Sequence, residues 1–297
     1  MATIVAIQGQ SGTGKSASLR DMAPDELLLI NVANKPLPFR KKFESVSTDQ
    51  YQEIIKEIKL TKKKIIVIDD AQYLMANEFM RRGTEKGFDK FTEIAQKFWT
   101  LVKTCEELPD DVIVYFLMHN EIDQNGNEKI KTIGKLLDEK ITLEGMFTIV
   151  LKTCVQDGVY TFATQNNGHD TVKSPMGMFK EMYIDNDLKF VDDCIRNYYE
   201  FEDSKTDEEI EEAAEEVKVE LPQRKPRGGR KSRTERAAED LKEYSKEVEE
   251  AVNGKEIDVQ EEELPEAKPS RRSSRKTTTE DEQPSRRSSR KSRRKLD

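Results

Sequence analysis

The stretch GQSGTGKS, residues 9–16, decides the fold of this chain, because it satisfies the phosphate-binding pattern G-x-x-x-x-G-K-[ST]. A short β-branched run at residues 3–7 precedes it, as expected of a buried parallel strand, and residues 15–22 can begin a helix. In such a unit the glycines let backbone N–H groups turn onto phosphate oxygens, and the helix N-terminus adds partial positive charge. The residues that we expect to bind a nucleotide are Gly9, Gln10, Ser11, Gly12, Thr13, Gly14, Lys15, Ser16 and Ala17.

Two of these residues have distinct chemical roles in the pattern. Lys15 is expected to reach the β- and γ-phosphates of ATP, and the Ser16 hydroxyl to ligate Mg²⁺. The run IIVIDD, residues 65–70, is typical of an apolar strand that ends in acid. At its tip, Asp69 is expected to accept a hydrogen bond from a water bound to Mg²⁺. The predicted metal site therefore consists of Ser16 and Asp69.

Hydrolysis also needs a group that orients or deprotonates the attacking water. Asp70, adjacent to the metal acid, and Glu78, just downstream, are both candidates, although such carboxylates are more often solvated surface groups. His119 or Asn120 follows the fourth predicted strand, where ligands bind in open α/β sheets, and is a candidate sensor of the γ-phosphate. The alternative for His119 is a structural or exposed polar residue.

The order of predicted elements indicates an α/β fold of the P-loop NTPase type, with a mostly parallel sheet covered by helices on both faces. The predicted strands are residues 3–7, 26–32, 64–68, 111–118 and 146–155, with a hairpin partner at 159–164. The predicted helices are residues 51–60, 88–108 and 187–199. We expect one folded domain over residues 1–200.

Residues 201–297 have the composition of a disordered, charged tail, because they contain too few apolar side chains to offset the entropy of ordering. Acidic blocks, residues 207–216 and 261–266, alternate with basic ones, residues 224–236, 271–276 and 286–295. Residues 234–252 have the composition of a short helix. The tail contributes strongly to the high proportion of charged residues in the chain, 36%.

The basic blocks of this tail suggest a nucleic-acid partner. The sequence PSRRSSRK at residues 269–276 recurs at residues 284–291, and flexible cationic segments of this kind bind phosphates by releasing counterions, without reading sequence. No aromatic residue lies among them, so base stacking by the tail is not expected. The alternative is a solubilising tail whose acidic and basic blocks pair with one another.

Cysteine and hydropathy patterns point to an intracellular, soluble protein. The three cysteines, Cys105, Cys154 and Cys194, are widely spaced and show no metal-binding spacing, so we expect reduced thiols in or near the core. No signal peptide and no apolar run of membrane-spanning length is present. A cytoplasmic location is therefore expected.

The chain resembles phage-encoded RecA-like ATPases associated with single-strand annealing and recombination. The resemblance depends on the P-loop close to the start, the run IIVIDD, the strand that closes on His119, and the later KSPMGMF at residues 173–179. It covers about residues 1–200. It implies a RecA-like fold, ATP and Mg²⁺ as cofactors, a single-stranded DNA partner, a possible homo-oligomer and a replication or recombination protein as a further partner. A phage origin would place the protein in the host cytoplasm.

The same resemblance implies roles for individual residues. Lys15, Ser16 and Asp69 would hold nucleotide and metal, and His119 matches the sensor position. Lys173 matches a basic residue that such ATPases project into the site of the neighbouring subunit. RecA-type enzymes usually carry a catalytic Glu after the second strand, but this chain has NVANK there, residues 31–35. Either Asp70 replaces it, or hydrolysis is slow and nucleotide binding acts as an assembly switch.

Two other function classes remain open at the level of sequence. A P-loop nucleoside or polynucleotide kinase would need lid arginines around the transferred phosphoryl group, and Arg81-Arg82-Gly83 is the compact candidate in the predicted domain. An ATP-binding loader or adaptor that hydrolyses little would fit the missing acid after the second strand.

Overall fold

The computed structural model describes residues 1–134 and 136–220 of the chain. The chain divides into two compact units, Met1–Gly228 and Gly229–Asp297, and every described residue belongs to the first. The predicted basic blocks and the predicted helix at residues 234–252 lie outside the described residues.

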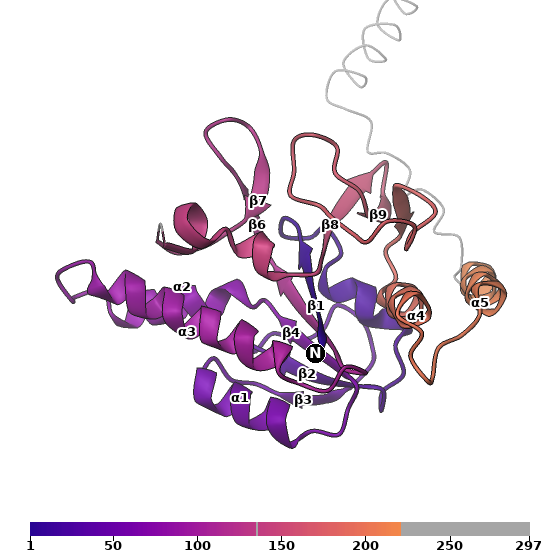
Figure 1. Cartoon of the computed structure of the whole chain (residues 1–297), viewed down its shortest axis with the longest axis horizontal. Coiled ribbons are helices and arrows are strands. Elements are labelled where there is room, and N and C mark those ends of the chain that lie inside the picture. Colours follow the sequence, from indigo (N-terminus) through magenta and orange to yellow (C-terminus); the bar gives the residue numbers. More distant parts are fainter. Residues whose placement is uncertain (135, 221–297) are drawn as a thin grey trace, which may run out of the picture. The chain divides into compact units, whose positions relative to one another are not determined.

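An eight-stranded sheet forms the centre of the described region (Figure 1). In spatial order its strands are β10 (Tyr183–Asp185), β9 (Val159–Ala163), β8 (Ile149–Gln156), β1 (Thr3–Gln8), β5 (Ile113–Met118), β4 (Ile65–Asp69), β2 (Leu27–Asn31) and β3 (Glu44–Val46). From β8 to β3 all neighbours are parallel, whereas β9 and β10 add to the β8 edge antiparallel. The carboxyl ends of the parallel strands therefore meet at one edge, which the P-loop, Asp69 and His119 share.

Helices cover both faces of the sheet, as the sequence predicts. On one face lie α1 (Tyr51–Leu60), α2 (Gln72–Arg81), α3 (Asp89–Glu106), the π-helix η2 (Leu136–Ile141) and the 3-10 helix η3 (Leu143–Met146). The other face is covered by the 3-10 helix η1 (Ser16–Asp21) and by α4 (Leu188–Tyr198). A two-stranded hairpin, β6 (Asn120–Ile122) and β7 (Glu128–Ile130), follows β5 directly.

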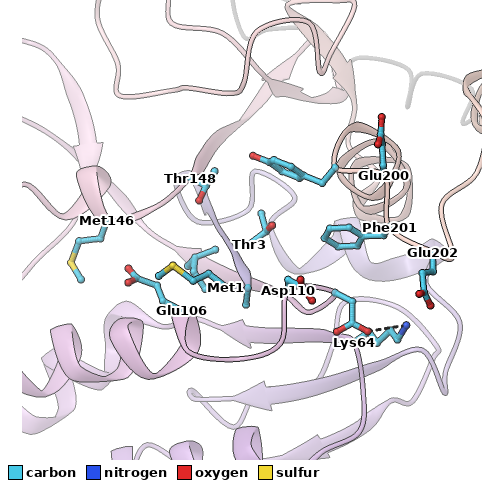
Figure 2. Close-up of a pocket in the computed structure, with 14 residues that line it drawn as sticks. Met1, Thr3, Lys64, Glu106, Asp110, Met146, Thr148, Glu200, Phe201 and Glu202 are labelled. Carbon is cyan, nitrogen blue, oxygen red and sulfur yellow. Dashed lines mark ion pairs between the residues drawn. The ribbon is translucent and has the colours of Figure 1, made fainter.

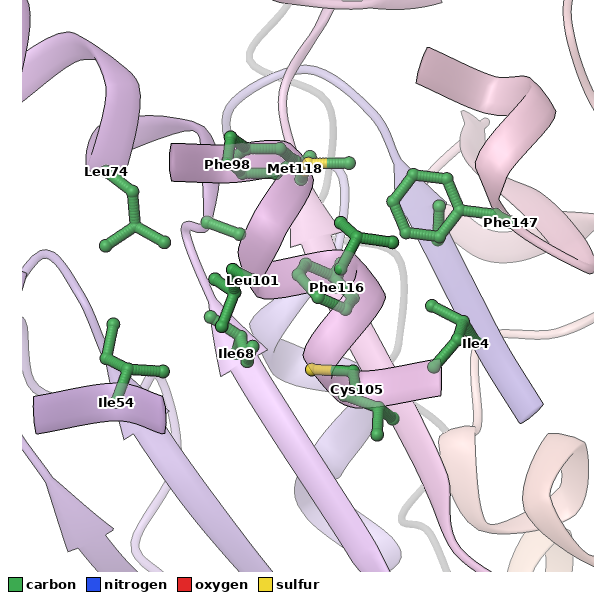
Figure 3. Packing of buried hydrophobic residues seen from close by; sticks show 14 of the residues in the cluster. Ile4, Ile54, Ile68, Leu74, Phe98, Leu101, Cys105, Phe116, Met118 and Phe147 are labelled. Atoms are coloured by element: carbon green, nitrogen blue, oxygen red, sulfur yellow. The ribbon is translucent and has the colours of Figure 1, made fainter. Parts of the chain in front are cut away.

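The α3 helix illustrates how the pattern of apolar residues produces this packing. Phe98, Leu101 and Cys105 recur at helical spacing and are fully buried against the strands (Figure 3). The Phe98 ring meets Phe116 of β5 edge to face, with 6.2 Å between ring centroids. Because successive strand residues point to opposite faces, Phe116 packs under α3 while its neighbour Tyr115 packs under α4.

The α4 helix is anchored to the sheet by a buried polar network. The Tyr115 hydroxyl donates to Asp192 Oδ1 at 2.8 Å, and Arg196 Nε donates to the other carboxylate oxygen at 2.7 Å. Each of these groups is buried and has a partner, which removes the desolvation penalty of an unpaired group. The predicted helix at residues 187–199 is thus confirmed, with the Asp187 side chain capping its first turn.

The folded region continues beyond residue 200, where the sequence predicts a disordered tail. Helix α5 (Asp207–Glu220) follows and packs against α4. Thr206 and Glu209 form a reciprocal capping box at its start, and Ile210 is only 5% exposed. Composition misses this helix because one buried isoleucine and a capping pair order a segment that is otherwise acidic.

The cysteines and the helices of the described region bear on the sequence analysis as well. The three cysteines are free, and Cys105 is buried. Among residues 1–134 and 136–220, no helix combines the length and the apolar character of a membrane span.

Candidate nucleotide site

The P-loop wraps the carboxyl end of β1 and is held from behind by β8. Gly9 lies so close to Thr153 of β8 that a Cβ there would meet the threonine Oγ1 at 1.8 Å. The Thr13 hydroxyl shares a 2.6 Å hydrogen bond with the same threonine. Gly12 and Gly14 have φ of +81° and +102°, which L side chains rarely adopt. The loop therefore needs glycine at positions 9 and 14, which the pattern fixes, and also favours it at position 12, which the pattern leaves open.

Most of the predicted nucleotide-binding residues face one cleft of about 1370 Å³. The P-loop residues that line it are Ser11, Gly12, Gly14, Lys15, Ser16 and Ala17. Gly9, Gln10 and Thr13 do not line it, and the Thr13 hydroxyl donates to the Gln10 carbonyl at 2.8 Å. The cleft has ample volume for a small-molecule ligand.

Lys15 is a buried cation at the base of this cleft, with only 6% of its surface exposed. Its Nζ donates to the carbonyl oxygens of Gly9 and Gln10, each at 2.7 Å. Burial lowers the pKa of Lys15 to about 8, against the opposing pull of Asp70 and Asp69. A desolvated ammonium held by neutral carbonyls is well placed to receive an anion, because a phosphate would restore the charge balance that burial removes.

Ser16 and Asp69 meet as the sequence predicts. The Ser16 hydroxyl donates to Asp69 Oδ1 at 2.9 Å, although the residues lie on different elements. Burial raises the pKa of Asp69 to about 6, with the charge of Asp70 adding to it and the Ser16 hydrogen bond opposing it. Two adjacent oxygen donors suit Mg²⁺, which commonly takes few protein ligands and completes its octahedron with phosphate and water oxygens. No group of three or more His, Cys, Asp or Glu side chains that suits a metal ion occurs among the described residues.

Asp70 lies beside His119 at the tips of β4 and β5. Its Oδ1 is 3.4 Å from His119 Nε2, and its Oδ2 is 3.0 Å from Lys35 Nζ. Burial acts to raise the pKa of Asp70, but the hydrogen bonds from His119 and Lys35 outweigh it and lower that pKa to about 2. Asp70 also has φ of +59°, an uncommon backbone conformation of the kind often found at functional sites. His119 and Asp70 both line the cleft.

The predicted catalytic residue Glu78 does not reach the cleft, and Lys173, whose predicted role is in the site of a neighbouring subunit, does not line the cleft of its own chain. Glu78 is buried on α2, where its Oε1 lies 2.6 Å from Lys97 Nζ and 3.4 Å from Arg82 Nη1. Lys173 exchanges backbone hydrogen bonds with Val150 of β8, and burial lowers the pKa of its ammonium. Neither lines the cleft. Glu78 therefore acts in this fold as the centre of an ion-pair network, because the face of α2 that carries it packs against α3.

The arginines that a kinase lid would need are also engaged elsewhere. Arg81 pairs with Asp49 at 2.6 Å, and Arg82 pairs with Glu85 and Glu93 at 2.7 and 2.8 Å. These arginines are absent from the lining of the cleft. The geometry thus gives the kinase hypothesis no support.

The structure adds site residues that no local pattern signals. Lys35, in the loop after β2, contacts Asp70 directly. On the opposite wall, Asn186 is 2% exposed, and its Nδ2 is buried with no partner. A Cβ on Gly14 would lie 2.9 Å from Asn186 Oδ1 and 3.0 Å from Cδ1 of Tyr160. Tyr160 and Asn186 come from the antiparallel edge strands and their ends, so only the folded chain brings them to the P-loop.

A second cavity, of about 860 Å³, lies at the other end of the sheet (Figure 2). Thr3 at the start of β1 lines it together with Phe201, and an ion pair joins Lys64 Nζ and Asp111 Oδ2 at 3.0 Å. Ligands of parallel α/β sheets bind at the carboxyl ends of the strands. The cleft at the P-loop, rather than this cavity, is therefore the candidate site.

Comparison with known proteins agrees with this geometry. A protein-family model described as an AAA domain matches residues 1–176. The matched region contains the P-loop, the acids after β4, and His119. No curated protein matches the chain.

Proposed function

Because the chain belongs to the AAA-domain family, and its domain is therefore a nucleotide-binding P-loop NTPase, we propose that it binds ATP with Mg²⁺ and hydrolyses ATP. The observation that carries this proposal is the meeting of Lys15, the Ser16–Asp69 pair and the Asp70–His119 pair in one cleft. These groups come from three parallel strands and supply a cation, an oxygen pair for a metal, and a carboxylate with a polar neighbour.

The residues divide the work as follows. Backbone N–H groups of the P-loop and the Lys15 ammonium bind the phosphates. Ser16 and Asp69 hold Mg²⁺, which when bound neutralises charge that develops on the phosphoryl oxygens. Asp70, which lines the cleft beside the proposed metal site, orients the attacking water.

We further propose that single-stranded DNA is the partner, in replication, recombination or annealing, and that the protein acts in the cytoplasm, that of the host if phage-encoded. The basic blocks at residues 224–236, 271–276 and 286–295 support this proposal, since cationic segments bind nucleic acid through phosphate contacts. So does the likeness to RecA-like annealing ATPases. ATP would favour an oligomeric, DNA-bound state, and a replication or recombination protein would be a further partner.

The state of Asp70 favours a second candidate, a loader or adaptor that binds ATP and hydrolyses little. Asp70 is bound on both sides by His119 and Lys35, and residues 31–35 contain no acid. Since no second acid after β2 helps Asp70 to activate a water, we expect ATP hydrolysis to be slow. The two candidates share the nucleotide site and differ in rate.

Steady-state ATP hydrolysis with and without single-stranded DNA separates these candidates, with D70N and K15A measured beside the parent protein. DNA-stimulated turnover that D70N removes supports the ATPase. ATP binding with negligible turnover in both conditions supports the adaptor. Unchanged ATP affinity in K15A would overturn the nucleotide site itself.

A further inference from the structure

The loop after β2 holds the backbone of Lys35 in place, while its side chain extends toward Asp70. The Asn31 side chain donates from Nδ2 to the Lys35 carbonyl at 2.7 Å and accepts from the Lys35 N–H at 3.2 Å. Asn34, between them, has φ of +50°, which tightens the turn. The Lys35 side chain is 60% exposed. The loop therefore presents one largely exposed side chain from a backbone that two hydrogen bonds fix.

This ammonium lies at the side of the cleft where the end of a polyphosphate chain would lie. Lys35 Nζ is 3.0 Å from Asp70 Oδ2 and 4.9 Å from the centroid of the Tyr73 ring. Its loop follows the strand whose last residue, Asn31, pairs in register with the metal acid Asp69. Lys15 binds at the β- and γ-positions of a P-loop ligand. Asp70 and Lys35 therefore lie near the terminal phosphate rather than near the nucleoside.

Arg20 and Lys180, which also line the cleft, have other partners. Arg20 contacts Asp21 and donates to the Asn186 carbonyl, and Lys180 pairs with Glu211 of α5. Among the described residues that line the cleft, Lys35 differs from these two cations because its ion-pair partner, Asp70, lies at the tip of β4.

An exchange of partners by Lys35 is physically easy. The Lys35 side chain is 60% exposed, so water can solvate its ammonium as it leaves Asp70, and the carboxylate keeps its contact with His119. The ammonium is a compact charge on a flexible four-carbon stem, which lets it move between neighbouring oxygens. A terminal phosphate carries more negative charge than one carboxylate and offers several acceptor oxygens. A diphosphate has no group at that position.

We propose that Lys35 is a specificity-determining residue, whose ammonium leaves Asp70 to bind the terminal phosphate of a nucleoside triphosphate and so distinguishes ATP from ADP. The inference rests on the proposed function. It also explains why this position carries a lysine: the same movement frees Asp70 Oδ2 when a triphosphate is bound, and keeps it paired otherwise.

Calorimetric binding of a non-hydrolysable ATP analogue and of ADP, both with Mg²⁺, tests the assignment in the full-length protein. In K35M, affinity for the analogue should fall at least tenfold, which is 1.4 kcal/mol, while ADP affinity stays within twofold. A fall of equal size for both ligands, or no fall for either, would overturn the assignment. K97M is the matched control, since Lys97 is also an exposed lysine paired with a carboxylate, but outside the cleft.

A double-mutant cycle excludes the simpler explanation that Lys35 only neutralises Asp70. If it did, adding K35M to D70N would leave the affinity for the analogue unchanged. We expect the tenfold loss to persist in K35M/D70N, because the lost contact is to the phosphate. A parent protein that binds neither ligand would overturn the proposed function itself, whereas normal binding with an unaltered ratio in K35M would overturn the role of Lys35 alone.

Discussion

Replacing Lys15 with methionine is expected to change how the free energy of unfolding depends on pH. Lys15 is 6% exposed, and burial lowers its pKa from 10.5 to about 8. Because a pKa difference of one corresponds to 1.36 kcal/mol, a pKa lowered by about 2.5 means that the charged Lys15 destabilises the folded state at pH 7 by about 3 kcal/mol. Methionine keeps most of the apolar stem but loses the two hydrogen bonds to the carbonyls. Each lost bond costs about 1 kcal/mol and so offsets part of the gain in stability from removing the buried charge. The variant without ligand should therefore be more stable by about 1 kcal/mol at pH 7.

The sign of the pH dependence follows from proton binding. Because the pKa of Lys15 is lower in the folded than in the unfolded chain, the folded state binds fewer protons between about pH 8 and pH 10.5. The stability of the parent protein, relative to K15M, should therefore rise across that window by up to about 3 kcal/mol. The order of stability of the two proteins should reverse between pH 7 and pH 10.

Urea unfolding followed by circular dichroism, in EDTA and without nucleotide, measures this difference at both pH values. K97M, which removes an exposed lysine, serves as the control and should show no such crossing. A difference between parent and K15M that is the same at pH 7 and pH 10 would refute the reasoning. Adding ATP and Mg²⁺ should stabilise the parent but not K15M, because only a ligand-binding folded state gains from the ligand.

Three further predictions test the site and its support. G14A should weaken ATP binding at least tenfold, because the new Cβ would meet Asn186 and the backbone has φ of +102°. G12A, with a similar φ but open space around the new Cβ, should lose less ATP affinity. Calorimetry compares the two variants, and equal losses of affinity would argue against the contact with Asn186. Burial, together with the charge of Asp21, raises the pKa of Asp187 to about 6, so the stability of the parent protein falls as pH rises through about 4 to 6. D187N should keep the α4 cap and gain up to about 3 kcal/mol of stability at pH 7.5 but almost none at pH 4. Urea titrations at the two pH values check this, and a gain that does not depend on pH would contradict it. F98A should lose about 3–5 kcal/mol of stability by creating a cavity under α3, with the ATP affinity of the remaining folded protein little changed.

Local patterns predict most of the fold. The parallel strands β1, β2, β4, β5 and β8 contain short apolar runs, and α1, α3 and α4 carry apolar residues at helical spacing, so the type and order of these elements can be predicted from the sequence. The edge strand β3, which reads ESV, has no such run and escapes the prediction. The α5 helix escapes such analysis because its order depends on Ile210, on a capping pair and on the neighbouring α4, which composition cannot weigh.

The half of the site that we propose to bind phosphate and metal is likewise determined by sequence. The backbone conformation of the P-loop is local, since it requires glycines at fixed spacing between a strand and a helix. The pairing of Ser16 with Asp69 follows from two motifs whose strands end at the same edge of a parallel sheet. In both motifs, a short stretch of sequence is enough to predict the local backbone geometry.

Only the tertiary structure decided which remaining side chains belong to the site. Glu78 and Asp70 are both acids near the same strand tip, yet packing turns Glu78 toward Lys97 and leaves Asp70 in the cleft. Lys35 and Asn186 enter the site from distant positions in the chain, through strand register and the edge hairpin. The direction of a side chain beyond a strand end depends on what the neighbouring strands and helices leave open, and that information is distributed over the whole chain rather than written in any one segment.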